Sequence, residues 1–315
     1  MTSLADAVAG WPPPVLDPAG PFADVINRLA WVLFAMGGAV LLLVLIATAV
    51  AVFGPRRWRR ALGGERLILI GGLAFPVIVL SALLIYGLTV SRHLSEAPRP
   101  GEMRVRITGE MWWWRVAYLD HEGREAFQAA NEIHIPVGRP VAFELEAADV
   151  IHSFWVPRLG GKTDMIPGRR NILRLQAERP GVYAGQCAEF CGGPHALMGL
   201  RVVAHDPTAF EAWRAREIQQ AAPAEGRGAE VFRIAGCGAC HTIRGTTANG
   251  LAGPDLTHIG SRRTLGAGVM RNSHPALTAW IADSQAIKPG NRMPSYPVLT
   301  GEDLRAVATY LHGLK

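Results

Sequence analysis

All four cysteines of the chain lie in two short motifs that also contain histidine. Cys187 and Cys191 belong to a loop that continues to a histidine and a methionine, Gly-Gln-Cys-Ala-Glu-Phe-Cys-Gly-Gly-Pro-His-Ala-Leu-Met, and the second motif is Cys237-Gly-Ala-Cys240-His241. Disulfides that staple a small secreted domain close longer loops than these. Soft thiolates beside imidazole and thioether are ligands that copper prefers, and Cys-x-x-Cys-His is the attachment signature of c-type haem. The sequence therefore predicts an electron carrier with two metal centres.

The first motif has the ligand types of a binuclear copper centre, in which two thiolates bridge the metals and each metal has a terminal imidazole. Cys187 and Cys191 would supply the bridges, His195 one imidazole and Met198 a thioether. The second imidazole must come from elsewhere, and His152, in Asp-Val-Ile-His-Ser-Phe, is the best candidate. On spacing alone, the cysteine pair also fits a disulfide or a redox-active thiol pair.

In the second motif, Cys237 and Cys240 would form thioethers with the haem vinyl groups, and His241 would bind the iron. A second axial ligand is needed, and methionine raises the reduction potential. Met293, in Arg-Met-Pro-Ser-Tyr ahead of the last predicted helix, fits this role better than Met270. The alternative reading, half of a zinc site, lacks a second pair of ligands at zinc spacing.

Two apolar runs of 25 residues, 29–53 and 67–91, contain no charged residue. Each exceeds the roughly 20 residues that a helix needs to cross a bilayer, so both are predicted to span a membrane. The loop between them holds five arginines against Glu65. Short basic loops stay in the cytoplasm, which places both termini and everything after Arg92 on the outer side. The first 28 residues show no basic segment followed by an apolar core, so no separate signal peptide is expected.

From residue 103 to about 206 the chain is predicted to form short strands, because runs such as 103–108 and 171–176 alternate apolar and polar residues. About a hundred residues of short strands favour an all-β sandwich or a Greek-key barrel. Asp206-Pro207 is typical of a helix start, and the helix is expected to reach about Gln220.

An Ala/Pro/Glu/Gly linker at 221–226 separates this region from a helical one. Helices are predicted over 228–234, 275–285 and 300–313, with Thr300 as a capping residue. Short helices around Cys-x-x-Cys-His are typical of a small all-α cytochrome c.

The formal net charge of +6 is unevenly distributed. Residues 226–315 have ten lysines and arginines against five acidic residues, whereas residues 93–225 have fifteen against seventeen. The arginine loop accounts for most of the remainder, so nucleic-acid binding is not indicated. A basic C-terminal region beside a mildly acidic one favours their docking.

The chain resembles subunit II of the haem–copper cytochrome c oxidases. The resemblance covers the two-helix transmembrane hairpin, the Trp112–Trp114 strand, Asp149–Ser153, Gly160–Arg169 and the cysteine loop. With a cytochrome c fused behind the copper domain, it is similar to the caa3-type enzymes, which are bacterial. The implied organisation is an outer N-terminal segment 1–28, a hairpin 29–92, an all-β cupredoxin (Greek-key) domain 93–220 with a CuA centre, the linker 221–226 and an all-α cytochrome c domain 227–315, anchored in the bacterial cytoplasmic (inner) membrane.

The resemblance also implies roles for single residues. Electrons would enter the copper centre at Trp112, and Glu189 would offer copper its backbone carbonyl and a magnesium ion its side chain, at the interface with subunit I. In the family, a glutamate near the start of the second span helps admit protons to subunit I. Pro76 lies farther from Glu65 than that pattern expects, so the role of Glu65 stays open. The copper ligands implied are His152, Cys187, Cys191, His195 and Met198.

The expected function is the electron-input subunit of a cytochrome-c oxidase. Electrons would pass from haem c to CuA and on to a haem in a separate subunit I, where O₂ is reduced to water with coupled proton translocation. The expected partners are subunit I with its haems and CuB, subunit III, and a cytochrome c or a bc1-type donor. The alternatives are a CuA-type nitric oxide reductase and, from another class, a copper-delivery protein. A quinol oxidase subunit is disfavoured because the copper ligands are intact.

Overall fold

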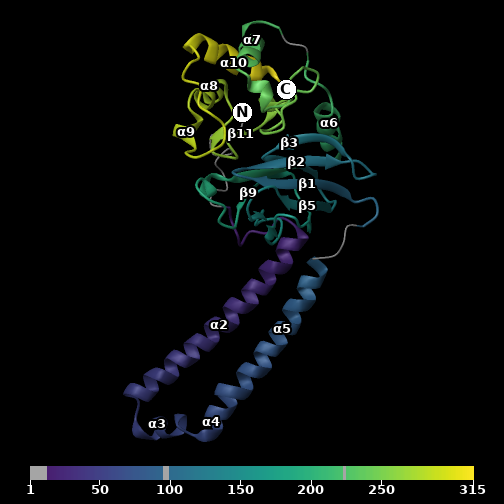
Figure 1. Ribbon diagram of the computed structural model, residues 1–315. Helices are drawn as coiled ribbons and strands as arrows, with labels where there is room; N and C mark the ends of the chain where they lie inside the picture. Colours follow the sequence, from purple (N-terminus) through teal and green to yellow (C-terminus); the bar gives the residue numbers. More distant parts are fainter. Residues whose placement is uncertain (1–12, 95–98, 223–224) are drawn as a thin grey trace. The chain divides into compact units, whose positions relative to one another are not determined.

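The computed structural model describes residues 13–94, 99–222 and 225–315 (Figure 1). By contacts the chain divides into two compact units. One is the hairpin Asp24–Glu96, and the other joins Met1–Ala23 to Ala97–Lys315. The expected N-terminal segment lies outside the described residues as far as residue 12, and so do residues 223–224 of the expected linker.

The hairpin unit consists of long apolar helices joined by short basic ones. Its elements are α2 (Pro21–Phe53), α3 (Arg56–Leu62), α4 (Glu65–Leu69), the π-helical turn η1 (Ile70–Ala74) and α5 (Phe75–Leu94). Helix α2 begins before the apolar run at Leu29, because Pro21 suits a first helical position and Asp24 pairs with Arg28 one turn later, at 2.5 Å.

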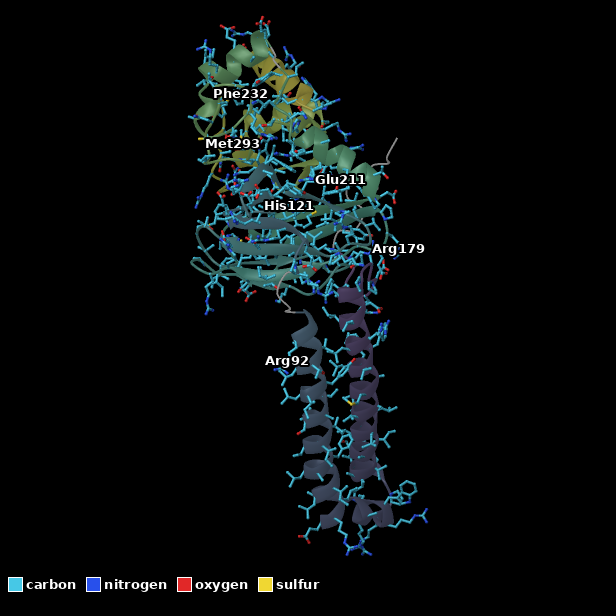
Figure 2. All side chains as sticks on the ribbon, turned by 90° about the vertical axis from the view of Figure 1, so that its right-hand side faces the viewer. Arg92, His121, Arg179, Glu211, Phe232 and Met293 are labelled. Carbon is cyan, nitrogen blue, oxygen red and sulfur yellow. The ribbon has the colours of Figure 1, made fainter. Side chains whose placement is uncertain are left out.

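Both long helices have the length and composition of membrane spans. Pro21–Phe53 and Glu65–Arg92 each reach a mean hydropathy of 2.7. Figure 2 shows mostly carbon in the side chains along both helices. Large apolar side chains such as Leu43 and Ile78 are exposed, each at 67%. A soluble domain rarely leaves so much apolar surface in water, whereas a bilayer covers it.

Residues 103–217, named here the β-sandwich domain, contain two five-stranded sheets within the described part of the chain. Buried side chains from both sheets, among them Ile107, Ile133 and Leu200, form one core between them. The strands of each sheet are given in the order in which they lie side by side. The first is β3 (Glu125–Ala130), β2 (Trp113–Leu119), β1 (Met103–Glu110), β5 (Val141–Ala147) and β8 (Asn171–Leu175); the second is β4 (Glu132–Pro136), β10 (Gly199–His205), β9 (Gly181–Cys187), β6 (His152–Trp155) and β7 (Thr163–Met165).

The pairing of the strands confirms an all-β fold of the cupredoxin kind. β1 pairs with β2 antiparallel and with β5 parallel, and β10 likewise pairs with β9 antiparallel and with β4 parallel. Parallel neighbours cannot come from hairpins, so the chain must cross between the sheets. Helix α6 (Pro207–Glu217) closes the domain and ends before Gln220, with Phe210 and Trp213 buried against the sheets.

Residues 227–315, named here the helical domain, pack around a second apolar core. The expected helix 275–285 is interrupted at Asp283, whose side chain accepts a hydrogen bond from the Ala286 N–H and so begins a new helix. Thr300 caps the last helix as expected, accepting from the Asp303 N–H at 3.1 Å. The elements are α7 (Arg227–Ile234), η3 (Cys237–Ala239), η4 (Ile259–Ser261), β11 (Thr264–Leu265), β12 (Met270–Arg271), α8 (His274–Ala282), α9 (Ser284–Ile287) and α10 (Gly301–Gly313).

Candidate metal centres

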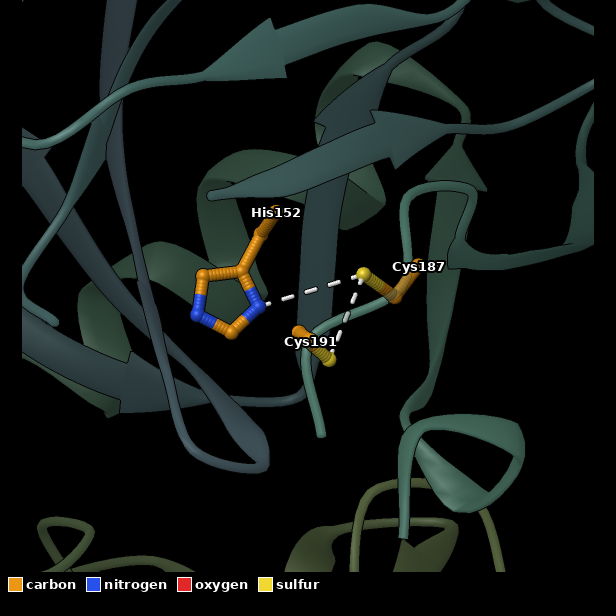
Figure 3. A group of neighbouring side chains, drawn as sticks. All are labelled: His152, Cys187 and Cys191. Atoms are coloured by element: carbon orange, nitrogen blue, oxygen red, sulfur yellow. Dashed lines mark hydrogen bonds between the residues drawn. The ribbon is translucent and has the colours of Figure 1, made fainter. Parts of the chain in front are cut away.

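The structure brings His152, Cys187 and Cys191 together in the interior of the β-sandwich domain (Figure 3). One ligand atom from each lies within 4.8 Å of the other two, and all three residues are buried. The two sulfurs are 3.8 Å apart, far beyond the 2.05 Å of a disulfide. The cysteines are therefore free, and the disulfide alternative does not apply to this structure.

The remaining expected ligands surround the same sulfurs. His195 Nδ1 lies 3.4 Å from Cys191 Sγ, and the sulfur of the buried Met198 lies 3.8 Å from it. The carbonyl oxygen of Glu189 is 3.2 Å from Cys187 Sγ, whereas the Glu189 side chain is exposed. Two thiolates, two imidazoles, a thioether and a carbonyl suit copper better than a hard cation. We call these side chains the cysteine–histidine cluster, which consists of His152, Cys187, Cys191, His195 and Met198.

Local structure explains how residues 35 positions apart meet. β6 and β9 pair antiparallel with Phe154 opposite Cys187, which brings the start of β6 to the end of β9. The cysteine loop then returns on itself, because the Cys187 N–H donates to the Met198 carbonyl at 2.9 Å. Gly192 has a φ of +104°, in the region that favours glycine, and its open side faces the Trp112 ring.

The electrostatics of the two sulfurs are asymmetric. A hydrogen bond from the Cys191 thiol, together with His152, lowers the pKa of Cys187 to about 4. The same hydrogen bond and burial raise the pKa of Cys191. Two anionic sulfurs this close would repel each other, so a bound cation would favour the form in which both are thiolates.

Asp149 orients the buried imidazole of His152. Its carboxylate accepts from His152 Nε2 at 2.9 Å, which leaves Nδ1 directed at Cys187, 3.9 Å away. Burial lowers the pKa of His152, but the hydrogen bonds to Cys187 and Asp149 outweigh it and raise the pKa overall. In metal sites, a histidine ligand commonly donates its second ring N–H to a carboxylate. Sequence reasoning assigned Asp149 no role, although a carboxylate three residues before the histidine was a usable signal.

Trp112 and Trp114 have different environments. The Trp112 ring is half-buried, and its Nε1–H donates to the Cys191 carbonyl at 2.8 Å. Trp114 is fully buried, edge-on to Phe154 at a centroid distance of 5.7 Å. Trp114 is therefore a core residue, and Trp112 is the tryptophan in contact with the cysteine loop.

The second motif opens onto an apolar pocket in the helical domain. The pocket is lined by Cys237, His241 and Met293 together with apolar side chains such as Phe232 and Leu256. Figure 2 labels Phe232 and Met293 in this domain. The volume of the pocket is only about 30 Å³, so a haem would have to separate the lining side chains. Met270 is not among the lining residues.

The Cys-x-x-Cys-His motif is one tight turn, because the His241 N–H donates to the Cys237 carbonyl at 3.0 Å. Cys237 is half-buried and Cys240 exposed. His241 Nδ1 is 2.8 Å from the Pro254 carbonyl and must donate to it, which leaves Nε2 free to bind a metal. Burial lowers the pKa of His241, which favours the neutral imidazole that metals need. These residues fit a covalently attached haem.

Comparisons with known proteins agree with this geometry. Residues 119–205 match the family "Cytochrome C oxidase subunit II, periplasmic domain", and residues 226–315 match "Cytochrome c". Cytochrome c oxidase subunit 2 of Alkalihalophilus pseudofirmus is 36% identical, over 95% of this chain and 90% of the relative. The chain belongs to the cytochrome c oxidase subunit II family.

Two further relatives come from Bacillus. Subunit 2 of Bacillus subtilis is 29% identical over 95% of this chain and 91% of the relative, and that of Bacillus sp. strain PS3 is 29% identical over 76% and 72%. This oxidase subunit thus has the caa3-type form, with a fused cytochrome c domain.

The family supplies the coarse function and decides between the alternatives. This subunit II delivers electrons to a haem–copper terminal oxidase, and it is anchored in a membrane with a periplasmic domain. Its periplasmic domain implies CuA and its cytochrome domain implies haem c. The nitric oxide reductase and copper-delivery alternatives have no support among these relatives.

Proposed function

We propose that this subunit II accepts electrons at a covalent haem c and passes them to a binuclear copper centre in the same chain. The observation that carries the proposal is the cysteine–histidine cluster, in which all residues except His195 are buried and the two cysteine sulfurs lie 3.8 Å apart. The copper ligands are the side chains of the cluster and the Glu189 carbonyl. The haem is attached through Cys237 and Cys240, with His241 and Met293 as axial ligands.

When bound, the two coppers and the haem iron supply one-electron redox chemistry. The chain contributes the geometry. Cys187 and Cys191 would hold the two coppers through their sulfurs, and Asp149 holds the His152 ring with Nδ1 facing the Cys187 sulfur. Four of the five side chains of the cluster are buried, and only His195 is partly exposed, so most of the ligands would reorganise little when the charge changes.

Met293 is supported as the second haem ligand by its fixed position in the pocket. Its N–H donates to the Asn291 side chain at 2.8 Å, and its carbonyl accepts from the Ser284 hydroxyl at 2.8 Å. The backbone of the loop is thereby held beside His241 without any constraint on the thioether. Met270 instead pairs with Leu265 in the small sheet β11–β12.

We further propose the route of the electrons through this subunit and its partners in the oxidase. Electrons from a cytochrome c or bc1-type donor enter the helical domain, cross to the β-sandwich domain near Trp112, and leave for subunit I, where O₂ becomes water with coupled proton translocation. Subunit III completes the complex. Both redox domains and both termini face the periplasm, since the arginine-rich turn at α3 favours the cytoplasm.

Magnesium at Glu189 and proton admission at Glu65 rest on the family resemblance. The exposed Glu189 carboxylate forms no cluster with two further metal-ligating side chains among the described residues. A magnesium site there would need ligands from subunit I.

Copper content tests the proposal. The full-length subunit should hold two coppers and one covalent haem, and His195→Asn should lose the copper pair while keeping the haem and the strands. His121→Asn, an exposed histidine of the same domain, is the matched control. One copper per chain, or a His195→Asn chain with the full copper content, would contradict the ligand set.

A further inference from the structure

Lys288 follows helix α9 in the helical domain, and its ammonium group is buried against the β-sandwich domain. The side chain is 2% exposed. Its Nζ donates to the carbonyl of Trp112 at 2.7 Å and to that of Leu197 at 2.9 Å, both in the β-sandwich domain. It also donates to the carbonyl of Gly266, in its own domain, at 2.9 Å. One ammonium group therefore joins the two domains.

Burial of this charge needs an explanation. A lysine is seldom fully buried unless it is paired, because desolvation of an ammonium group is costly. Lys288 has no salt bridge within the described residues, and its hydrogen bonds go to three main-chain carbonyls. Burial lowers the pKa of Lys288 to about 7. If Lys288 served only to end helix α9, its ammonium group would not need to be buried with three carbonyl partners.

Two of the carbonyls that bind Lys288, those of Trp112 and Leu197, belong to residues next to the proposed copper ligands. Trp112 donates through its indole to Cys191, and Leu197 directly precedes Met198. Lys288 thus holds the backbone of the tryptophan and of the cysteine loop at the same time. A shift of the helical domain would break both hydrogen bonds together.

A second contact from the same loop reaches the other side of the cluster. Arg292, next to Met293, pairs with Asp149 at 3.2 Å, and Asp149 is hydrogen-bonded to His152. The loop that carries Met293 therefore contacts the copper centre at two separate points. The pairing with Asp149 is partly exposed and worth little by itself, so the buried Lys288 is the stronger of the two.

We propose that Lys288 is the positioning residue that docks the haem domain on the copper domain for electron transfer within one chain. The inference deepens the proposed function and rests on it. In each transfer one electron leaves the haem and one enters the copper pair, and Lys288 carries no electron itself. Its part is to fix the Met293 loop against Trp112 and the cysteine loop.

Lysine footprinting of the intact oxidase tests the docking without any substitution. The chain has three lysines, Lys162, Lys288 and Lys315, and the first and last are exposed. An amine-acylating reagent should modify Lys162 and Lys315 readily and leave Lys288 unmodified until the complex is denatured. Modification of Lys288 at the rate of Lys315 would overturn the docked arrangement.

Substitution tests the function. Lys288→Met removes the donors but keeps an unbranched side chain that is one heavy atom shorter. Lys315→Met makes the same charge change at an exposed site of the helical domain. In the intact oxidase, flash-induced transfer from haem to copper should slow about tenfold in Lys288→Met, since docking loses buried charged hydrogen bonds. Lys315→Met should keep the wild-type rate. Reduction of the haem by an added donor, and both metal spectra, should be unchanged in each variant.

The outcomes separate the two proposals. A wild-type chain without a binuclear copper spectrum would contradict the proposed function. Normal spectra with a wild-type transfer rate in Lys288→Met would contradict only the docking role of Lys288. If Lys288→Met fails to assemble, Lys288→Arg, which keeps the charge but cannot match the same carbonyls, takes its place and should also slow the transfer. Transfer at the wild-type rate in Lys288→Arg, with Lys288 reactive in the footprint, would refute the proposal.

Discussion

The indole Nε1–H of Trp112 donates a hydrogen bond of 2.8 Å to the main-chain carbonyl of Cys191. This bond joins an aromatic ring at the edge of the β-sandwich domain to a residue of the buried sulfur pair. The ring also lies over Gly192, where an added Cβ would come within 3.2 Å of it. The tryptophan is therefore held against the cysteine loop by a hydrogen bond and by close packing.

Removal of the ring should slow electron entry without disturbing either metal. We expect Trp112→Ala to slow haem-to-copper transfer by about tenfold to a hundredfold, because a small displacement of reacting groups has effects of that size. The copper and haem spectra should stay as in the wild type. Trp112→Phe, which keeps an aromatic ring but loses the N–H donor, should give a smaller effect. An unchanged rate in Trp112→Ala would place electron entry elsewhere.

Substitution of the two methionines of the helical domain should distinguish them. Met293→Ala should leave the haem covalently attached, since attachment depends on Cys237 and Cys240, but should lower its reduction potential because the thioether ligand is lost. Met270→Ala should leave the potential unchanged. Redox titration of the haem band decides between them. The reverse pattern would mean that Met270 is the ligand.

Transfer within the chain should resist salt. The linker keeps the two domains at an effective concentration of order millimolar, and Lys288 is buried from mobile ions. The screening length falls from about 10 Å at 0.1 M to about 3 Å at 1 M. Flash-induced transfer from the fused haem should therefore fall only mildly across a salt series, whereas electron input from added cytochrome c should fall steeply. Equal salt dependence of the two rates would show that the linker between the two domains does not maintain their docking.

A partly buried pair of histidines predicts acid sensitivity of the β-sandwich domain. His205 Nε2 lies 2.7 Å from His134 Nδ1, and His134 Nε2 lies 2.9 Å from Glu132. Burial, with repulsion from His134, lowers the pKa of His205 to about 4. In the unfolded chain this pKa is about 6.5. Between these values the unfolded state binds a proton that the folded state does not, so stability falls as the pH falls from about 6.5 to about 4.

Amide exchange of strand β10 across this pH range, corrected for the intrinsic exchange rates, measures that loss. His205→Gln should flatten the dependence, because glutamine does not titrate. His121→Gln, at an exposed histidine of the same domain, should leave it as in the wild type. If His205→Gln retains the full acid dependence, another group is responsible.

Features with a strong local signal could be predicted from the sequence. The two spans followed from uncharged apolar runs, and β1 followed from the alternation that the structure shows as buried Val105 and Ile107. Within the cysteine loop the ligand spacing was enough to identify four candidates. His152, 35 residues away from Cys187, was identified because the two sequence segments resemble one known family.

Features that depend on distant contacts could not be predicted. Every residue of β2 is at least partly buried, so the strand lacks the alternation of apolar and polar residues that marks a strand with one face in solvent. The strands β6 and β7 are four and three residues long, too short for any periodicity. Lys288 gave no signal at all, because its partners Trp112 and Leu197 lie 176 and 91 residues away.

Electron transfer between the two centres of one chain is the central claim, and time-resolved absorbance after photoreduction of the haem tests it most directly. The full-length subunit would receive one electron at the haem, and the haem and copper bands would be followed together. We predict that haem reoxidation and copper reduction have the same rate constant and a one-to-one stoichiometry. Reoxidation of the haem with no matching change in the copper band would contradict the account.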